Sequence, residues 1–280
     1  MQREVSAIVV SHNSRRVLMP CLGSLLDTGG PVLQEVLLVD NLSDDGCATE
    51  ALERYPEVRL VTPPERQGYA ANVNLGIRNA EGRYVLVANP DLVFCPNSLS
   101  LLVRYLQDHP KVGIVGPKLV NPDGSLQLSC RRWHTPTALL LRRGPWAARC
   151  EKTRPVRHFM MSDWDHSESA VVDWLLGACL LARREALEAV GPMDSRFFLY
   201  FEDVDWCLRM HKAGWHVAYC PEAVVVHHHQ KASQGLRSPA ARHHLRSLLK
   251  YILKHRGRLG MRAPQTRPAP RRSGPRTPGE

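Results

Sequence analysis

Three short apolar runs, each ending in small polar residues, most strongly constrain the fold of this chain. The runs lie at residues 5–11, 35–39 and 83–88, and a helical pattern follows the first of them. Continuous runs of Val, Leu and Ile separated by helices are typical of a parallel sheet covered on both faces. Open sheets of this kind bind ligands beyond the carboxyl ends of their strands. The sequence therefore predicts a binding site near Asp40 and Asp91, which follow the second and third runs.

An aromatic run at residues 197–201 leads directly into Glu202, Asp203 and Asp205. Aromatic side chains bury large apolar areas, whereas carboxylates are rarely buried unless they are paired. The juxtaposition predicts a walled pocket with an acid at its rim, whose raised pKa would suit it to act as a base. A second interpretation is that Asp203 or Asp205 caps the helix predicted over residues 204–212.

The composition is that of a globular protein. A hydrophobic content of 44% in 280 residues supports a sizeable core, in one large domain or two small ones. No window of about 18 uninterrupted apolar residues occurs, so no membrane span is expected, and the first strand begins too close to Met1 for a signal peptide. The eight cysteines include no Cys-x-x-Cys pair, which argues against zinc and disulfides and predicts a cytoplasmic location.

The C-terminal end is basic. Residues 257–280 carry six arginines and one glutamate and are rich in Pro and Gly, which predicts a disordered basic tail. Residues 245–254 form an amphipathic helical pattern with Arg246, Lys250 and Lys254 on its polar side. This helix either packs on its own domain or lies on a membrane surface, and the tail is either solvated or attracted to anionic lipid. We expect deletion of the tail to weaken binding to anionic vesicles.

Since the basic residues are not interleaved with aromatic ones, no nucleic-acid partner is expected.

An ordered series of motifs runs along residues 4–256. The motifs are residues 8–13, 38–43, 68–76, 89–91, 172–174 with 177–179, 197–205, 214–215 and 226–229. Together they resemble the family 2 glycosyltransferases, and more narrowly the bacterial branch of rhamnosyltransferases and galactofuranosyltransferases. The resemblance implies a GT-A fold, in which a Rossmann-like, mostly parallel sheet is flanked by helices, here with a C-terminal helical extension. It also implies a nucleotide-diphosphate-sugar donor, a divalent metal and an inverting displacement.

By this resemblance, Asp91 holds a Mg²⁺ or Mn²⁺ ion, although Asn89 stands where the family often has the first Asp of an Asp-x-Asp motif. A histidine after the last strand serves some members of the family as a further metal ligand. The spacing to Ser233 favours His228, with His227 second. Because side chains alternate along a strand, His227, His228 and His229 cannot all bind one ion. Three polar residues that simply close a strand are the other interpretation.

The resemblance also assigns the remaining site residues. Asp203 is the general base, assisted by Glu202, while Trp174 and Asp205 lie on the acceptor side. The donor-binding residues are Ser11, Asn13, Asp40, Gly68, Asn72 and Asn89. Residues 1–235 form the catalytic domain, with a donor half over about 1–120 and an acceptor half over about 121–235. The amphipathic helix follows at 236–256, and the irregular stretch at 130–170 is expected to form loops over the acceptor.

The expected activity is transfer of rhamnose from a dTDP donor, or of galactofuranose from a UDP donor. The acceptor would be a cell-surface glycan or a lipid-linked glycan, reached by peripheral contact with the inner face of the cell membrane. Two alternatives remain: a non-catalytic relative that only binds the nucleotide sugar, and a dinucleotide-binding oxidoreductase. The absence of Gly-x-Gly-x-x-Gly after the first strand weighs against the second.

Overall fold

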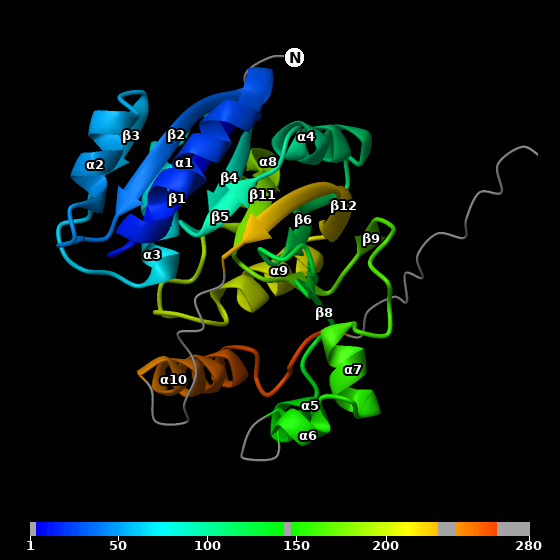
Figure 1. The fold of residues 1–280 in the computed structure, drawn as a ribbon. Helices are drawn as coiled ribbons and strands as arrows, with labels where there is room; N and C mark the ends of the chain where they lie inside the picture. The colour runs from blue at the N-terminus through cyan, green and yellow to red at the C-terminus, as the bar shows by residue number, and fades with distance from the viewer. Residues whose placement is uncertain (1–3, 143–146, 229–238, 262–280) are drawn as a thin grey trace, which may run out of the picture.

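A computed structural model describes residues 4–142, 147–228 and 239–261. His229 and residues 262–280 of the predicted tail lie outside these ranges. Within them the chain forms one large mixed sheet with helices on both faces. A smaller group of helices, which we call the helical end, lies below the sheet in the view of Figure 1.

The large sheet has ten strands in the described ranges. They are β1 (Val5–Ser11), β2 (Leu33–Asp40), β3 (Val58–Val61), β4 (Tyr84–Ala88), β5 (Leu92–Phe94), β6 (Val112–Val120), β7 (Leu126–Gln127), β9 (Ala170–Val171), β11 (Cys179–Arg183) and β12 (His216–His227). The order along the sheet is β3-β2-β1-β4-β11-β6-β12-β5, with β7 beside β6 and β9 beside β12. A separate antiparallel pair joins β8 (Cys130–Arg131) to β10 (Trp174–Leu175).

The predicted parallel arrangement is found at the N-terminal side of the sheet. Strands β3, β2, β1 and β4 are parallel, and β6 pairs with β12 in the same sense. Strand β11 lies between these two groups and is antiparallel to both of its neighbours, so the sheet is mixed. Strands β11 and β12, which come from beyond residue 120, thus share this sheet with the N-terminal strands.

The helices of the described ranges cover both faces of the sheet or form the helical end. They are α1 (Arg15–Gly29), α2 (Cys47–Arg54), α3 (Tyr69–Asn79), α4 (Ser98–Asp108), α5 (Pro136–Leu141), α6 (Ala147–Cys150), α7 (Arg154–Met160), α8 (Arg184–Val190), α9 (Glu202–Lys212), α10 (Pro239–Lys254) and the 3₁₀ turn η1 (Gly30–Val32). Across these residues, no helix is both long and apolar enough to span a bilayer.

Alternation along β1 explains the two cores. Val5, Ala7 and Val9 pack on one face with α1, α2 and α4, whereas Ile8 and Val10 pack on the other with α3, α8 and α9. Successive side chains of a strand point to opposite faces, so a continuous apolar run supplies both layers at once. The prediction of a sheet covered on both faces is confirmed.

Two regions differ from the sequence-based expectation. The stretch at 130–170 is not only loop, because it contains β8 and the short helices α5, α6 and α7. The packed chain also extends past the predicted boundary at residue 256. Leu259 packs against the core, and Gly260 lies so close to Trp133 that an added Cβ would be 2.2 Å from the Trp133 side chain.

Candidate active site

The N-terminus of α9 presents two neighbouring carboxylates, Glu202 and Asp203, below the carboxyl ends of the parallel strands. The two residues before them, Tyr200 and Phe201, have φ angles of 69° and 71°. Bulky side chains rarely adopt this left-handed conformation, so the turn is strained. Strain of this kind persists only where the surroundings hold it, and it is concentrated at functional sites. Here it sets the direction in which both carboxylates leave the helix.

The two carboxyl groups have different surroundings. Asp203 accepts hydrogen bonds from the backbone N–H groups of Gly177 (3.0 Å, to Oδ2) and Val204 (2.8 Å, to Oδ1). Among the described residues, none donates a hydrogen bond to the buried Glu202 Oε2. Burial raises the pKa of Asp203, and burial together with the Asp203 charge raises the pKa of Glu202 well above its usual value. The N–H donors stabilise the charged form of Asp203. Of the two carboxyl groups, Asp203 therefore loses its proton more readily, and Glu202 keeps its proton more readily.

This difference predicts that Glu202→Gln stabilises the protein at neutral pH. A carboxyl whose pKa is higher in the folded than in the unfolded state binds more protons when folded. Its contribution to stability is complete below the unfolded pKa of about 4.3 and is lost as the pH rises through the folded pKa. Gln has no proton to lose, so the variant should gain on the order of 1 kcal/mol at neutral pH, or a few degrees in Tm.

Thermal unfolding at acidic and neutral pH measures this effect. Glu188→Gln, at an exposed position of α8, is the matched control and should leave Tm unchanged at both pH values. A lower Tm of Glu202→Gln at neutral pH would show that Glu202 is ionised and paired.

Gly68 brings the aromatic loop onto the donor side of the sheet. A Cβ at Gly68 would lie 2.6 Å from the Phe198 Cα atom, and Tyr69 N–H donates to the Phe198 carbonyl at 2.8 Å. Only glycine permits so close an approach of two backbones. Gly68 was predicted to line a pocket. In the structure it lies where the N-terminus of α3 contacts the loop that carries Glu202 and Asp203, and we call this backbone contact the seam.

Tyr69 links this seam to the metal motif and was not singled out from the sequence. Its hydroxyl lies 3.0 Å from Asn89 Oδ1 and 3.1 Å from the Gly177 carbonyl. Burial, reinforced by the charges of Glu202 and Asp203, raises the pKa of Tyr69 well above its usual value, so the hydroxyl stays protonated.

The remaining predicted donor residues lie at the ends of β1 and β2. The Asp40 carboxylate accepts from the backbone N–H (3.0 Å) and the hydroxyl of Ser43, and Ser11 is buried beside Cys47. Asn13 holds the same loop, since its Oδ1 accepts from Asp44 N–H at 3.0 Å. Each carboxylate oxygen has two lone pairs, so Asp40 retains acceptor capacity for a nucleobase N–H.

Asn72 and Asn41 shape the N-terminal end of α3. Asn72 Nδ2 donates to the Gly68 carbonyl at 3.1 Å, while no described residue donates to its buried Oδ1. Asn41, which the sequence did not single out, exchanges two hydrogen bonds with the backbone of Gln67. These contacts fix the loop at 67–68 against the strand edge.

Asp91 and His227 form a candidate metal site. Asp91 Oδ1 is buried, lies 3.4 Å from His227 Nε2 and accepts no hydrogen bond from a described residue. His228, which the spacing favoured, is exposed, and its backbone N–H donates to the Asp91 carbonyl at 2.8 Å. The structure therefore brings His227 rather than His228 to the carboxylate. No cluster of three His, Cys, Asp or Glu side chains suited to an ion occurs in the described parts of the chain.

A chain of hydrogen bonds orients His227. Its Nδ1 lies 2.5 Å from Gln127 Oε1, and Gln127 Nε2 donates to Asn121 Oδ1 at 3.1 Å. Asn121 Nδ2 in turn donates to Ser125, whose hydroxyl donates to Asp123. In this order Nδ1 faces the Gln127 amide oxygen, and Nε2 is turned toward Asp91. A carboxylate oxygen and an imidazole nitrogen are both ligand types for divalent transition metals such as Mn²⁺.

Arg131 is a further residue that the sequence did not single out. It is buried in β8, opposite Trp174 of β10, and donates to the Cys130 carbonyl at 2.7 Å. Burial lowers the pKa of Arg131 to about 10, against the attraction of Asp203. A guanidinium with this pKa remains charged at neutral pH, so a permanent cation lies near the carboxylates.

Trp174 and Asp205 are positioned differently from the acceptor-side expectation. The Trp174 indole N–H donates to the Arg132 carbonyl at 3.0 Å, and the ring is buried in the aromatic cluster around His134. Asp205 is fully buried, pairs with the cations of Arg209 (2.8 Å) and Lys254 (2.7 Å), and lies 2.9 Å from His255 Nε2. Both Asp205 oxygens are thus occupied by contacts that fasten α10 to α9, so the side chain faces the C-terminal helix.

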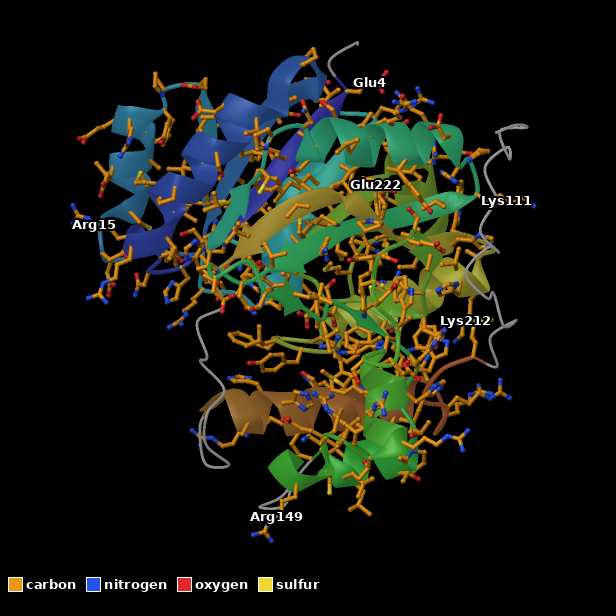
Figure 2. The ribbon with its side chains drawn as sticks, turned by 45° about the vertical axis from the view of Figure 1, so that its right-hand side comes forward. Glu4, Arg15, Lys111, Arg149, Lys212 and Glu222 are labelled. Carbon is orange, nitrogen blue, oxygen red and sulfur yellow. The ribbon has the colours of Figure 1, made fainter. Side chains whose placement is uncertain are left out.

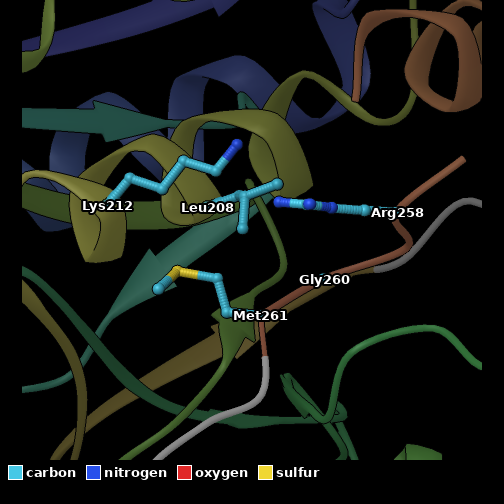
Figure 3. Close-up of a pocket in the computed structure, with 5 residues that line it drawn as sticks. All are labelled: Leu208, Lys212, Arg258, Gly260 and Met261. Carbon is cyan, nitrogen blue, oxygen red and sulfur yellow. The ribbon is translucent and has the colours of Figure 1, made fainter. Parts of the chain in front are cut away.

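A cavity of about 680 Å³ lies at the other end of α9. It is lined by Leu208, Lys212, Arg258, Gly260 and Met261 (Figure 3). It contains none of the predicted site residues, and it adjoins the point at which the described chain ends. The candidate active site is therefore the edge formed by Asp40, Asp91, His227 and the start of α9.

Comparisons with known proteins identify the family of this chain. The model of glycosyltransferase-like family 2 matches residues 2–245. N-acetylglucosaminyl-diphospho-decaprenol L-rhamnosyltransferase of Mycobacterium tuberculosis is 36% identical over 275 residues, which cover 89% of this chain and 84% of the relative.

Solved structures show the same fold. GalNAc-T7 with UDP, GalNAc and Mn²⁺ superposes with a TM-score of 0.64 at 17% identity, over 89% of this chain and 48% of its own. The mannosyltransferase of Pyrobaculum calidifontis with GDP-Man and Mn²⁺ superposes with a TM-score of 0.61 at 22% identity, over 90% and 65%. The chain thus spans about half to two thirds of the length of these two structures. The expected GT-A fold is confirmed, and the chain belongs to glycosyltransferase-like family 2 as a glycosyltransferase.

Proposed function

We propose that this glycosyltransferase moves a rhamnosyl residue from a nucleotide-diphosphate sugar to a lipid-linked glycan, with inversion at the anomeric carbon. The observation that carries the reaction class is the pair Glu202 and Asp203 at the strained start of α9, held beside the seam at Gly68. The choice of sugar and acceptor is supported by the mycobacterial relative, whose name specifies both.

Asp203 accepts the proton of the acceptor hydroxyl in this proposal. Its carboxylate is ionised because Gly177 and Val204 donate to it, and its raised pKa makes it a stronger base than an exposed Asp. The hydroxyl oxygen attacks the anomeric carbon as its proton passes to Asp203, and the bond to the nucleoside diphosphate breaks with its electron pair. Because attack and departure occur on opposite sides of the carbon, the configuration inverts.

Other residues hold the substrates. The raised pKa of Glu202 favours its protonated form beside Asp203, which limits the negative charge at the attacking oxygen. Asp40, at the end of β2, accepts a nucleobase N–H, while Arg131 offers a fixed positive charge near the reacting groups. The Tyr69 hydroxyl contacts Asn89 and the Gly177 carbonyl, and so holds both in place relative to α9.

Asp91 and His227 would hold the divalent metal. A carboxylate oxygen and an imidazole nitrogen 3.4 Å apart are ligand types that Mn²⁺ or Mg²⁺ could share, and two protein ligands suffice where substrate phosphates and waters complete the coordination. When bound, such an ion neutralises charge on the diphosphate as it leaves.

The hydrogen-bonded chain behind His227 predicts that Gln127→Leu weakens Mn²⁺ binding about 10- to 100-fold, the usual effect of removing such an orienting partner. Gln127→Glu keeps an acceptor for the Nδ1 proton and should bind Mn²⁺ more tightly than the Leu variant. Titration calorimetry with Mn²⁺ in the presence of the nucleotide measures both constants. If Gln127→Leu and the unaltered protein bound Mn²⁺ with equal affinity, His227 would not be a ligand of the metal.

A transfer assay tests the function itself. The protein, Mn²⁺ and dTDP-rhamnose are incubated with an isoprenoid diphosphate that carries N-acetylglucosamine, and the lipid product is detected by mass spectrometry. We expect a mass increase of one deoxyhexose. Transfer from UDP-galactofuranose but not from dTDP-rhamnose would favour the other donor, and binding without transfer from any donor would favour the non-catalytic alternative.

A further inference from the structure

The C-terminal helix α10 exposes its leucines to solvent. The exposed fractions of Leu245, Leu249 and Leu253 are 53%, 53% and 78%, whereas Ser247, Leu248 and Tyr251 are buried. Residues four apart on a helix are displaced by about 40°, so the three leucines form one stripe within an arc of about 80°. Single exposed leucines are ordinary, but a stripe over three turns marks an interaction surface.

Basic side chains border this stripe. Arg242 and Arg246 are exposed and lie at helix positions between and beside the leucines, and Arg256 is exposed just beyond the end of the helix. The sequence contains no Asp or Glu between Glu222 and Glu280, so no acid can offset them within the element. We call the surface formed by Arg242, Leu245, Arg246, Leu249 and Leu253 the α10 face.

The helices next to α10 also carry exposed leucine and arginine side chains. Helices α5, α6 and α10 lie together at the end opposite α4 and the N-terminal end of β1, as both views show (Figures 1 and 2). Leu140 of α5 is 68% exposed. Arg149 of α6 projects from this end (Figure 2).

We propose that the α10 face docks on an anionic lipid surface. Its leucines would enter the boundary between headgroups and acyl chains, while the arginine stems lie along the apolar layer and their guanidinium groups reach lipid phosphates. Charge decides between this occupant and a second copy of the chain. Two copies packed through this face would oppose arginine to arginine with no acid to pair them, whereas an anionic surface complements the face.

The lipid surface would be coupled to the reaction through rigid contacts. Ser247 Oγ donates to the Leu199 carbonyl at 2.8 Å, and Lys254 and His255 pair with the buried Asp205, two residues after Asp203. The inner side of α10 thus fastens to the segment at 199–205 that presents the catalytic carboxylates. Docking of the outer side would hold Asp203 at a fixed height above the bilayer, where a lipid-linked hydroxyl can reach it.

Vesicle co-sedimentation of the full chain tests this surface. The vesicles are phosphatidylcholine with and without phosphatidylglycerol, and the test variant is Leu245→Ser/Leu249→Ser/Leu253→Ser. We expect the full-length protein to bind the anionic vesicles, more weakly in high salt because exposed charges are screened. We expect the triple variant to bind at least about tenfold more weakly, since each leucine loses its burial in the interface. The residues beyond 261 are identical in both proteins, so their charge cancels from the comparison.

Leu60→Ser is the matched control, because Leu60 is an exposed leucine of β3, far from α10, and its variant should bind as the unaltered protein does. All replaced side chains are exposed, so Tm should change little in each variant. Equal vesicle binding of the triple variant and the unaltered protein would overturn the proposal, as would no binding by the unaltered protein. A concentration-dependent dimer that the triple substitution abolishes would show that a second copy occupies the face instead.

Discussion

Asp203→Asn is expected to lower kcat on the order of 10²-fold or more, the usual scale for loss of a general base, while donor affinity stays near normal. The side chain keeps its shape, and its amide oxygen can still accept from Gly177 N–H, so the loop that carries it should not move. What is lost is the capacity to take a proton from the acceptor hydroxyl. Steady-state kinetics and titration of the nucleotide sugar separate the two effects.

Glu202→Gln is the control for this experiment. Glu202 is the neighbouring carboxyl of the same helix turn, and burial together with the Asp203 charge raises its pKa, so it keeps its proton more readily than Asp203. Its conversion to Gln therefore removes no base and should leave most of the turnover intact. Normal turnover of Asp203→Asn together with inactive Glu202→Gln would show that the base is Glu202.

Asp91→Ala is expected to reduce transfer at least about 10²-fold, the scale at which loss of a charge-stabilising group slows such reactions. Chelation by EDTA should abolish transfer, and Mn²⁺ or Mg²⁺ should restore it. Because Asp91 Oδ1 accepts no hydrogen bond from the described residues, its truncation should leave the fold intact. The measurements are the transfer rate, Mn²⁺ affinity by calorimetry and Tm for each variant.

The two histidines provide an internal comparison. His227→Ala should weaken Mn²⁺ binding, because Nε2 lies 3.4 Å from Asp91 Oδ1, whereas His228→Ala should have little effect, because that side chain is exposed. The reverse order would favour His228, as the spacing to Ser233 did. Full transfer by a rigorously metal-free preparation would contradict a metal at Asp91.

The strands and the carboxylates were predictable because their signals are local. A strand buried on both faces is apolar at every position, so the runs that became β1, β2 and β4 could be located directly. The antiparallel direction of β11 was not predictable in this way. It depends on pairing between Cys179–Arg183 and Tyr84–Ala88, which are about a hundred residues apart, and no property of either segment specifies the direction.

The orientation of α10 shows the same limit. Periodicity alone placed Lys254 on the polar side of the helix, opposite the leucines. The structure places Lys254 against Asp194 and Asp205 and leaves three of the leucines outside. Those two acids come from distant parts of the sequence, and a buried acid without cations would be costly. Likewise Tyr69 and Gln127 make their hydrogen bonds with residues of other segments, so no local pattern marked them.

The stereochemistry of transfer tests the central claim most directly. The protein is incubated with dTDP-rhamnose, Mn²⁺ and a soluble analogue of the N-acetylglucosaminyl lipid diphosphate, and NMR determines the anomeric configuration of the first product formed. A single displacement with Asp203 as the base predicts a configuration opposite to that of the donor, and no product from Asp203→Asn on the same timescale. Retention of the donor configuration would contradict direct attack by the acceptor hydroxyl, and with it the role assigned to Asp203.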